Sequence, residues 1–184
     1  VLGLGALTKS MGDAGVTVAK LSDIPITTGN SYSASAALWA TADAVRRMGF
    51  IEMAKGKRLK GKTMVIGATG AVGSVCSKLL ATAFEEIYMV DTHDAILLAL
   101  RESILHEFKD VHVAISTRAD KYLPDMDVIV TATSMPVKKM MDIGQVKPGC
   151  VITDVNRPLN FTLKDVKKRP DVLIIASGEI TLPG

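Results

Sequence analysis

The feature that most constrains the fold is a short run in which an apolar, β-branched segment passes directly into a glycine-rich turn: Met64-Val65-Ile66-Gly67-Ala68-Thr69-Gly70-Ala71-Val72-Gly73. Apolar residues then recur at helical spacing, at Val72, Val75, Cys76, Leu79 and Leu80. A strand that turns through glycines into a helix is typical of the opening of a parallel α/β unit.

The three glycines of this run follow the spacing GxxGxxG, a variant seen in dinucleotide-binding folds. Gly67 permits the tight turn, Gly70 lets backbone N–H groups approach a pyrophosphate, and Gly73 lets the helix pack on the strand. The positive end of the helix then faces the phosphates. The sequence predicts a dinucleotide site formed by Gly67, Ala68, Thr69, Gly70, Ala71, Val72 and Gly73, with a purely structural turn as the alternative.

Asp91 ends the next predicted strand, 24 residues after Gly67. A carboxylate there accepts hydrogen bonds from the adenosine ribose hydroxyls and repels a 2′-phosphate. No lysine or arginine follows before Arg101, so this position favours NAD over NADP. The alternative is that Asp91 only caps the following helix.

Six short apolar runs predict strands, at residues 63–66, 87–90, 111–115, 128–131, 151–153 and 172–175. Helical patterns separate the first three runs, at residues 72–83 and 94–108, and shorter connections separate the rest, at 119–123, 140–146 and 163–168. This alternation predicts an α/β fold with a doubly wound, mostly parallel Rossmann sheet, in which ligands bind beyond the carboxyl ends of the strands.

Polar segments follow three of the predicted strands, and the parallel order brings them to the same edge. Thr131, Thr133 and Ser134 follow the fourth strand and are expected beside the nicotinamide-side ribose. Residues 154–158 and 177–179 follow the fifth and sixth strands. Ordinary turn chemistry is the alternative for each segment.

The region before the sheet differs in composition, being rich in Gly, Ala, Ser and Thr. We predict a strand at 24–27 and a helix at 32–48 that ends at Gly49. The predicted organisation is a remnant of a truncated N-terminal catalytic or substrate domain (1–28), a bridging helix (29–56) and an NAD(P)-binding domain (57–184). The basic run at 55–62 reads as a solvated linker, or alternatively as a patch for phosphate or an acidic partner.

Composition excludes several classes of function. With 22 Lys+Arg against 19 Asp+Glu, the net charge of +3 is too small to indicate a nucleic-acid partner. Residues 24–42 carry no charge, yet they include Pro25, Gly29 and Asn30, which predicts burial in protein rather than in a membrane. The run Gly3-Leu4-Gly5 lacks a third glycine and is not expected to be a nucleotide loop.

No catalytic residue can be assigned from the residues alone. Cys76 and Cys150 form neither a disulfide framework nor a metal-ligand pattern, so both are expected in the core and the protein in a reducing cytoplasm. His93 is expected near a bound adenosine rather than in acid–base chemistry. We predict no metal site.

Four segments together resemble the long-chain fatty acyl-ACP reductases of cyanobacteria and their bacterial relatives: GLGALT (3–8), GDAGVT (12–17), ITTGNSYSASAA (26–37) and VIGATGAVGSVCSKLL (65–80). Two later segments, TATSMP (131–136) and TDVNRP (153–158), are also similar to the Rossmann domains of glutamyl-tRNA reductase and shikimate/quinate dehydrogenase.

The resemblance implies a nicotinamide-dependent reductase that converts a fatty acyl thioester, small or carried by an acyl-carrier protein, to an aldehyde. It also implies a cysteine that takes up the acyl group. The family's nucleophile lies C-terminal to the Rossmann unit, and neither cysteine of this chain matches it. The cyanobacterial enzymes are associated with NADPH, whereas Asp91 favours NADH. A shikimate- or quinate-type dehydrogenase and a non-catalytic dinucleotide-binding module are the alternatives, and a homo-oligomer is compatible with each.

Overall fold

The computed structural model describes residues 1–4, 13, 15–49, 58–137 and 140–178. Its main body is a six-stranded sheet in which every neighbouring pair is parallel, in the order β5-β4-β3-β6-β7-β8. The strands are β3 (Leu59–Ile66), β4 (Phe84–Val90), β5 (His112–Ser116), β6 (Val128–Thr131), β7 (Val151–Asp154) and β8 (Leu173–Ala176). The prediction of a doubly wound α/β fold is confirmed.

The direction of winding reverses between β3 and β6, which pair with each other through Met64 and Ile129. β4 and β5, the next two strands in the chain, lie on one side of β3, whereas β6, β7 and β8 lie on its other side. In open parallel sheets, ligands bind in the crevice that such a reversal leaves beyond the carboxyl ends of the strands. The glycine-rich turn at the end of β3 stands at this crevice.

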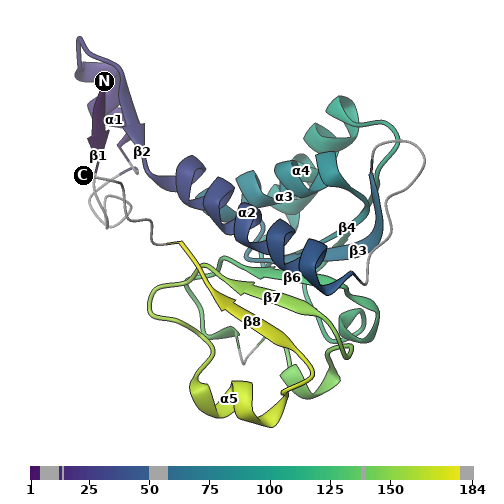
Figure 1. The fold of residues 1–184 in the computed structure, drawn as a ribbon. Coiled ribbons are helices and arrows are strands. Elements are labelled where there is room, and N and C mark those ends of the chain that lie inside the picture. Colours follow the sequence, from purple (N-terminus) through teal and green to yellow (C-terminus); the bar gives the residue numbers. More distant parts are fainter. Residues whose placement is uncertain (5–12, 14, 50–57, 138–139, 179–184) are drawn as a thin grey trace.

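Both faces of the sheet are covered. Successive side chains of a strand point to opposite faces, and here the side chains of both faces are buried in hydrophobic clusters. Val65 packs with α2 (Asn30–Met48), α3 (Ala71–Ala83) and α4 (Asp94–Glu107) on one face. Met64 and Ile66 pack on the other face, with the single-turn segments η2 (Leu123–Asp125) and η4 (Ile143–Gln145) and the region of α5 (Leu163–Lys168). Figure 1 shows α2, α3 and α4 on the side of the sheet opposite to α5.

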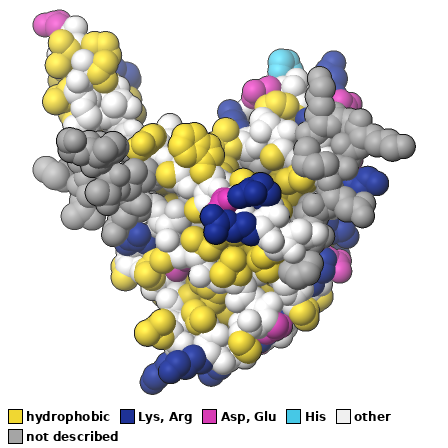
Figure 2. Space-filling model, in the orientation of Figure 1, with side chains coloured by type: hydrophobic (Ala, Val, Ile, Leu, Met, Phe, Trp, Pro, Cys, Tyr) yellow, Lys and Arg dark blue, Asp and Glu magenta, His cyan; other side chains and the backbone are white. Residues whose placement is uncertain are grey.

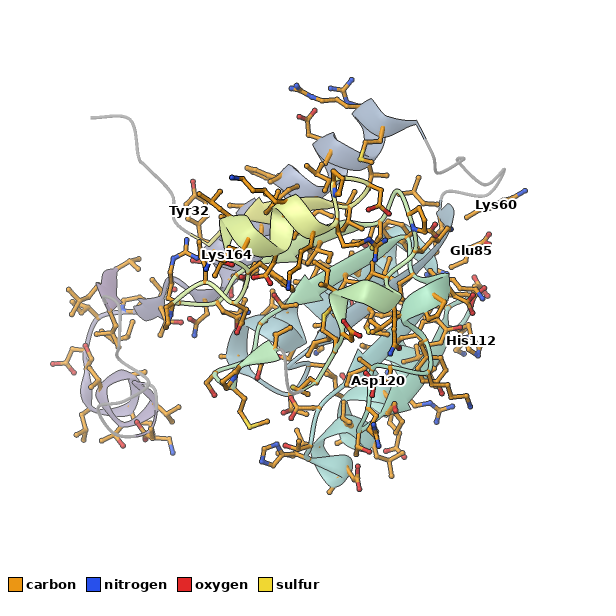
Figure 3. All side chains as sticks on the ribbon, turned by 90° about the horizontal axis from the view of Figure 1, so that it is seen from below. Tyr32, Lys60, Glu85, His112, Asp120 and Lys164 are labelled. Atoms are coloured by element: carbon orange, nitrogen blue, oxygen red, sulfur yellow. The ribbon has the colours of Figure 1, made fainter. Side chains whose placement is uncertain are left out.

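The basic run at residues 55–62 is predicted to be a solvated linker, and the structure contradicts this prediction for residues 59–62. Residues 55–57 lie outside the described ranges, but β3 begins at Leu59, so the expectation of a linker through residue 62 is wrong. Leu59 pairs with Phe84 at the start of β4, and this pairing extends the sheet by four residues beyond the predicted start at residue 63. Figure 3 shows Lys60 and Glu85 projecting from this amino-end edge, where both line a shallow charged hollow.

The N-terminal part stands apart from the sheet. β1 (Leu2–Leu4) pairs in parallel with β2 (Ile26–Thr28), and α1 (Val16–Leu21) connects them. β2 confirms a strand near residues 24–27, whereas β1 was not predicted. Figures 1 and 2 show this lobe projecting beyond the N-terminal end of α2. Most of the run at 3–8 lies outside the described residues, and the boundaries at 28 and 56 stay predictions.

Candidate functional site

The glycine-rich loop is held between the ends of two neighbouring strands. The backbone N–H groups of Gly67 and Ala68 donate to the carbonyl oxygen of Val90 in β4, at 2.8 and 3.3 Å. The N–H of Gly70 donates to the carbonyl of Gly67 at 3.2 Å, which closes the turn before α3 begins. The loop therefore has a fixed backbone path at the switch point of the sheet.

Two of the three glycines are required by close backbone approach. Gly67 has φ +85°, and a Cβ there would lie 2.5 Å from the carbonyl oxygen of Ala132 and 2.8 Å from Cα of Thr133. A Cβ on Gly73 would overlap the carbonyl oxygen of Gly67. Since every obstructing atom belongs to the backbone, neither position has room for a side chain. The loop is thus packed against the start of α3 and against the segment that follows β6.

The start of α3 is open at its first turn. Gly70 occupies the N-cap position, and no side chain of the described residues caps the first N–H groups of the helix. Thr69 and Gly70 are half-buried and Ala71 is exposed, while Ala68 is fully buried and Val72 packs against the core. Uncapped N–H groups at a helix N-terminus are suited to bind an anion such as a phosphate.

Asp91 lies beside the loop with 8% of its surface exposed. Its Oδ2 accepts hydrogen bonds from the N–H and the hydroxyl of Thr69, at 3.0 and 2.7 Å. Its Oδ1 accepts from the N–H of Thr92 at 2.7 Å and lies 3.1 Å from Nδ1 of His93. Burial raises the pKa of the Asp91 carboxyl, but these hydrogen bonds outweigh burial and hold the pKa below its ordinary value.

The alternative role for Asp91, as a cap of the next helix, does not fit the structure. The N-cap residue of α4 is His93, and within the described part of the chain no side chain caps this helix. The Asp91 carboxylate instead joins the end of β4 to the glycine-rich loop through Thr69. Nothing in the sequence signalled this partnership, because Thr69 and Asp91 are 22 residues apart.

The three site residues predicted at the carboxyl end of β6, Thr131, Thr133 and Ser134, have different surroundings. Thr131 is fully buried, and its hydroxyl donates to Oδ1 of Asp154 at 3.0 Å. The Thr133 hydroxyl accepts the N–H of Met135 at 3.1 Å, and Ser134 is exposed. Thr133 and Ser134 line a hollow of about 310 Å³ together with Met135, Pro136, Arg157, Pro158, Leu159 and Asn160. The structure thus brings the predicted segments 131–136 and 154–158 together.

Sequence reasoning missed the buried polar residues that support this hollow. Asp154 is 1% exposed and Asn156 is 7% exposed. They follow the apolar run of β7 directly, and this was the signal available: polar side chains at the carboxyl end of a buried strand. The sequence indicates segment 154–158 by its position alone and assigns no role to any residue in it.

A larger apolar groove, of about 580 Å³, lies elsewhere on the molecule. Leu38, Trp39 and Val45 of α2 face Leu80 at the end of α3 and Phe84 at the start of β4. Figure 2 shows hydrophobic side chains gathered along α2. The glycine-rich loop precedes α3, whereas the groove lies at the far end of this 13-residue helix, about 20 Å away at the rise of an α-helix. The groove is therefore separate from the candidate site.

Both cysteines are in the core, as predicted. Cys76 and Cys150 are fully buried, and burial raises the pKa of each thiol to about 12.

His112 lies on the edge strand β5, where its ring is next to the ring of Tyr88. Among the described residues, no group of three or more His, Cys, Asp or Glu side chains is arranged to hold a metal ion. Nor does any described helix have the length and apolar character that crossing a membrane requires.

Comparison by sequence gives one distant relative to report and no family model that matches. The chain is 24% identical over 189 residues to the aminotransferase PigE of a Serratia species. The match covers 98% of this chain and 20% of that protein, so the chain spans about a fifth of the relative's length.

Comparison by structure gives several dehydrogenases and reductases. The quinate dehydrogenase of Corynebacterium glutamicum, solved with NAD, matches with TM-score 0.55 and 15% identity over 86% of this chain and 55% of its own. The shikimate 5-dehydrogenase of Listeria monocytogenes, solved with shikimate and NAD, gives 0.54 and 15% over 81% and 53%. The 5-ketofructose reductase of a Gluconobacter species gives 0.56 and 16% over 83% and 53%. The chain spans about half of each, and it shares with them the Rossmann fold.

Proposed function

We propose that this chain is the nicotinamide-dinucleotide-binding domain of an oxidoreductase. The observation that carries the proposal is the loop at the end of β3, in which Gly67 and Gly73 admit no side chain and the first turn of α3 is uncapped. This is the geometry that a pyrophosphate needs, and it stands at the switch point of a parallel sheet. The NAD complexes of two proteins with the same fold support it.

Within this proposal, residues 67–73 cradle the pyrophosphate through backbone N–H groups. Asp91 receives the adenosine ribose hydroxyls, which would replace some of its present donors, and its negative charge disfavours a 2′-phosphate. We therefore propose NAD rather than NADP. Thr133 and Ser134, at the hollow beside the loop, belong to the nicotinamide side. The bound cofactor would supply a hydride from its reduced nicotinamide.

For the reaction, we propose reduction of a fatty acyl thioester to an aldehyde, on the resemblance of residues 26–37 and 65–80 to acyl-ACP reductases. The proposal assigns the acyl-accepting group to neither cysteine of this chain, since both thiols are buried with a pKa of about 12. A second candidate is the direct reduction of a carbonyl by a shikimate- or quinate-type dehydrogenase, favoured by the shared fold.

The cofactor proposal is tested by calorimetric titration of the chain with NADH and with NADPH at matched salt. We expect tighter binding of NADH, and loss of the preference for NADH over NADPH in Asp91→Ala. Tighter binding of NADPH by the unaltered chain would overturn the assignment of NAD. If neither cofactor binds, the proposal of a dinucleotide-binding domain fails.

The reaction is tested on the protein that carries this chain. A medium- or long-chain acyl thioester and NADH are supplied, and the aldehyde is trapped and identified. Aldehyde formation supports the acyl-thioester proposal, whereas oxidation of shikimate or quinate without aldehyde formation supports the second candidate. Dinucleotide binding without either reaction favours the non-catalytic module.

A further inference from the structure

Asp154, the last residue of β7, is a carboxylate placed almost wholly inside the protein, with 1% of its surface exposed. A buried charge is costly unless hydrogen bonds compensate it. Five donors surround this carboxylate, and they come from more than one segment of the chain. The identity of the donors shows what the carboxylate holds together.

The Oδ2 atom of Asp154 holds the loop that follows its own strand. It accepts the backbone N–H of Asn160 at 2.6 Å and that of Phe161 at 3.3 Å. Charge-assisted hydrogen bonds to a carboxylate are stronger than those between neutral groups. The chain between residues 155 and 161 is therefore folded back onto the end of β7.

The Oδ1 atom holds the neighbouring strand. It accepts the hydroxyl of Thr131 at 3.0 Å, the side-chain N–H of Asn156 at 2.6 Å and its backbone N–H at 3.2 Å. The Asn156 side chain also donates to the carbonyl oxygen of Thr131 at 3.1 Å. One carboxylate thus ties the end of β6 to the loop after β7.

A further hydrogen bond fastens the two loops to each other. The side-chain oxygen of Asn160 accepts the N–H of Val137 at 3.0 Å. Residues 133–136 form one wall of the 310 Å³ hollow, and residues 157–160 form the other. The spacing of these walls depends on the residues that Asp154 binds, although Asp154 is not itself among the residues that line the hollow.

One wall of the hollow lies against the first residue of the glycine-rich loop. Cα of Thr133, in one wall, lies 2.8 Å from the position that a Cβ on Gly67 would take. A dinucleotide whose pyrophosphate rests on this loop has its nicotinamide half directed to the strands on the far side of the switch point. That direction leads to the hollow between the ends of β6 and β7.

We propose that Asp154 is a positioning residue that sets the shape of the pocket for the nicotinamide half of the cofactor without touching the cofactor. The proposal rests on the proposed function and adds to it the residue on which the pocket's walls depend. Thr131 then acts through Asp154 rather than by direct contact. An amide at position 154 would turn an NH2 group toward donors, so even the isosteric Asp154→Asn change disturbs the walls.

The test compares two ligands that differ in whether they reach the hollow. ADP carries the adenosine and the two phosphates only, whereas NADH also carries the nicotinamide riboside. We expect Asp154→Asn to raise the Kd for NADH about tenfold or more, the effect of one buried hydrogen bond, and to change the Kd for ADP less than about twofold. A purely structural role would weaken both ligands together.

Asp127→Asn is the matched control. Asp127 also joins strands, through the N–H of Lys62 and the ammonium of Lys147, but at the amino-end edge of the sheet. We expect this variant to bind NADH and ADP as the unaltered chain does. If Asp154→Asn does not fold, Thr131→Val keeps the carboxylate and removes one hydroxyl, which donates to Asp154 and accepts the side-chain N–H of Asn156 at 3.0 Å. This variant is expected to raise the Kd for NADH about threefold while leaving that for ADP unchanged.

Equal weakening of NADH and ADP by the variant that folds, or no weakening of NADH, overturns the positioning role of Asp154. These results are distinct from failure of the proposed function itself. In that case the unaltered chain binds neither NADH nor ADP, and the positioning role falls with it.

Discussion

The hydroxyl oxygens of Thr41 in α2 and Thr153 in β7 lie 2.6 Å apart, and both residues are buried. Thr41 also donates to the carbonyl oxygen of Ala37 one turn earlier in α2, at 2.8 Å. The distance between the two hydroxyl oxygens allows either to be the donor, and we infer that Thr153 donates because the Thr41 proton is directed at Ala37. The pair fastens the bridging helix to the strand that ends at Asp154.

This arrangement predicts unequal effects of removing each hydroxyl. Thr41→Val leaves the buried Thr153 hydroxyl without an acceptor and is expected to lower the free energy of unfolding by about 1–3 kcal/mol. Thr153→Val leaves the Thr41 proton on Ala37 and is expected to cost about 0.5–1.5 kcal/mol. Chemical denaturation of both variants measures the difference.

The double variant is the control for this pair. Replacing both threonines by valine removes donor and acceptor together and keeps the shape, so it is expected to be more stable than Thr41→Val alone. Additive losses in the double variant would show that the two hydroxyls are not coupled.

A second prediction concerns Gly73. Gly73→Ala places a Cβ against the backbone of Gly67, which no side-chain rotation can relieve. We expect the start of α3 to shift, the unfolding free energy to fall by about 1–3 kcal/mol and NADH affinity to drop. Gly3→Ala is the control, because a Cβ at Gly3 meets nothing within 4 Å. Unaltered stability and affinity in Gly73→Ala would contradict the close packing of helix and loop.

The third prediction is a pH dependence that originates at Asp91. Its pKa in the folded protein is lower than in the unfolded chain, where an aspartate titrates near about 3.9. The stabilisation is therefore fully present above that value and is lost as the pH falls through the folded pKa. Asp91→Asn is expected to cost about 1–3 kcal/mol at neutral pH.

The difference in stability between the unaltered chain and Asp91→Asn should shrink once the pH drops below about 4. Urea denaturation at several pH values measures it, with the exposed Asp110 changed to Asn as the control. A difference that is constant down to pH 2 would show that the charge of Asp91 is not what binds Thr69.

The fourth prediction concerns the thiols. Burial raises the pKa of both Cys76 and Cys150 to about 12, so almost no thiolate is present near pH 8. A chromogenic disulfide reagent is expected to leave the native chain unmodified and to titrate two thiols after denaturation. Rapid reaction of either thiol in the native chain would contradict the assignment of both cysteines to the core.

The sequence by itself determined the elements of the sheet and the glycine-rich turn, because these depend on local patterns. The run from Met64 to Gly73 specifies strand, turn and helix through side-chain spacing and glycine conformations that neighbouring residues control. The strands of the body were predicted to within about three residues, except β3. β3 starts earlier because Leu59 pairs with Phe84, and strand pairing is a contact between distant segments.

Only the tertiary structure decided how the polar residues at the carboxyl edge are partnered. Thr69 binds Asp91, and Thr131 binds Asp154 rather than facing the hollow, although both pairs are separated by more than twenty residues. A buried carboxylate takes whichever donors the fold brings to it, and a single sequence does not record which segments meet. The position of such residues at strand ends is local and predictable, whereas their hydrogen-bond partners depend on how neighbouring strands align.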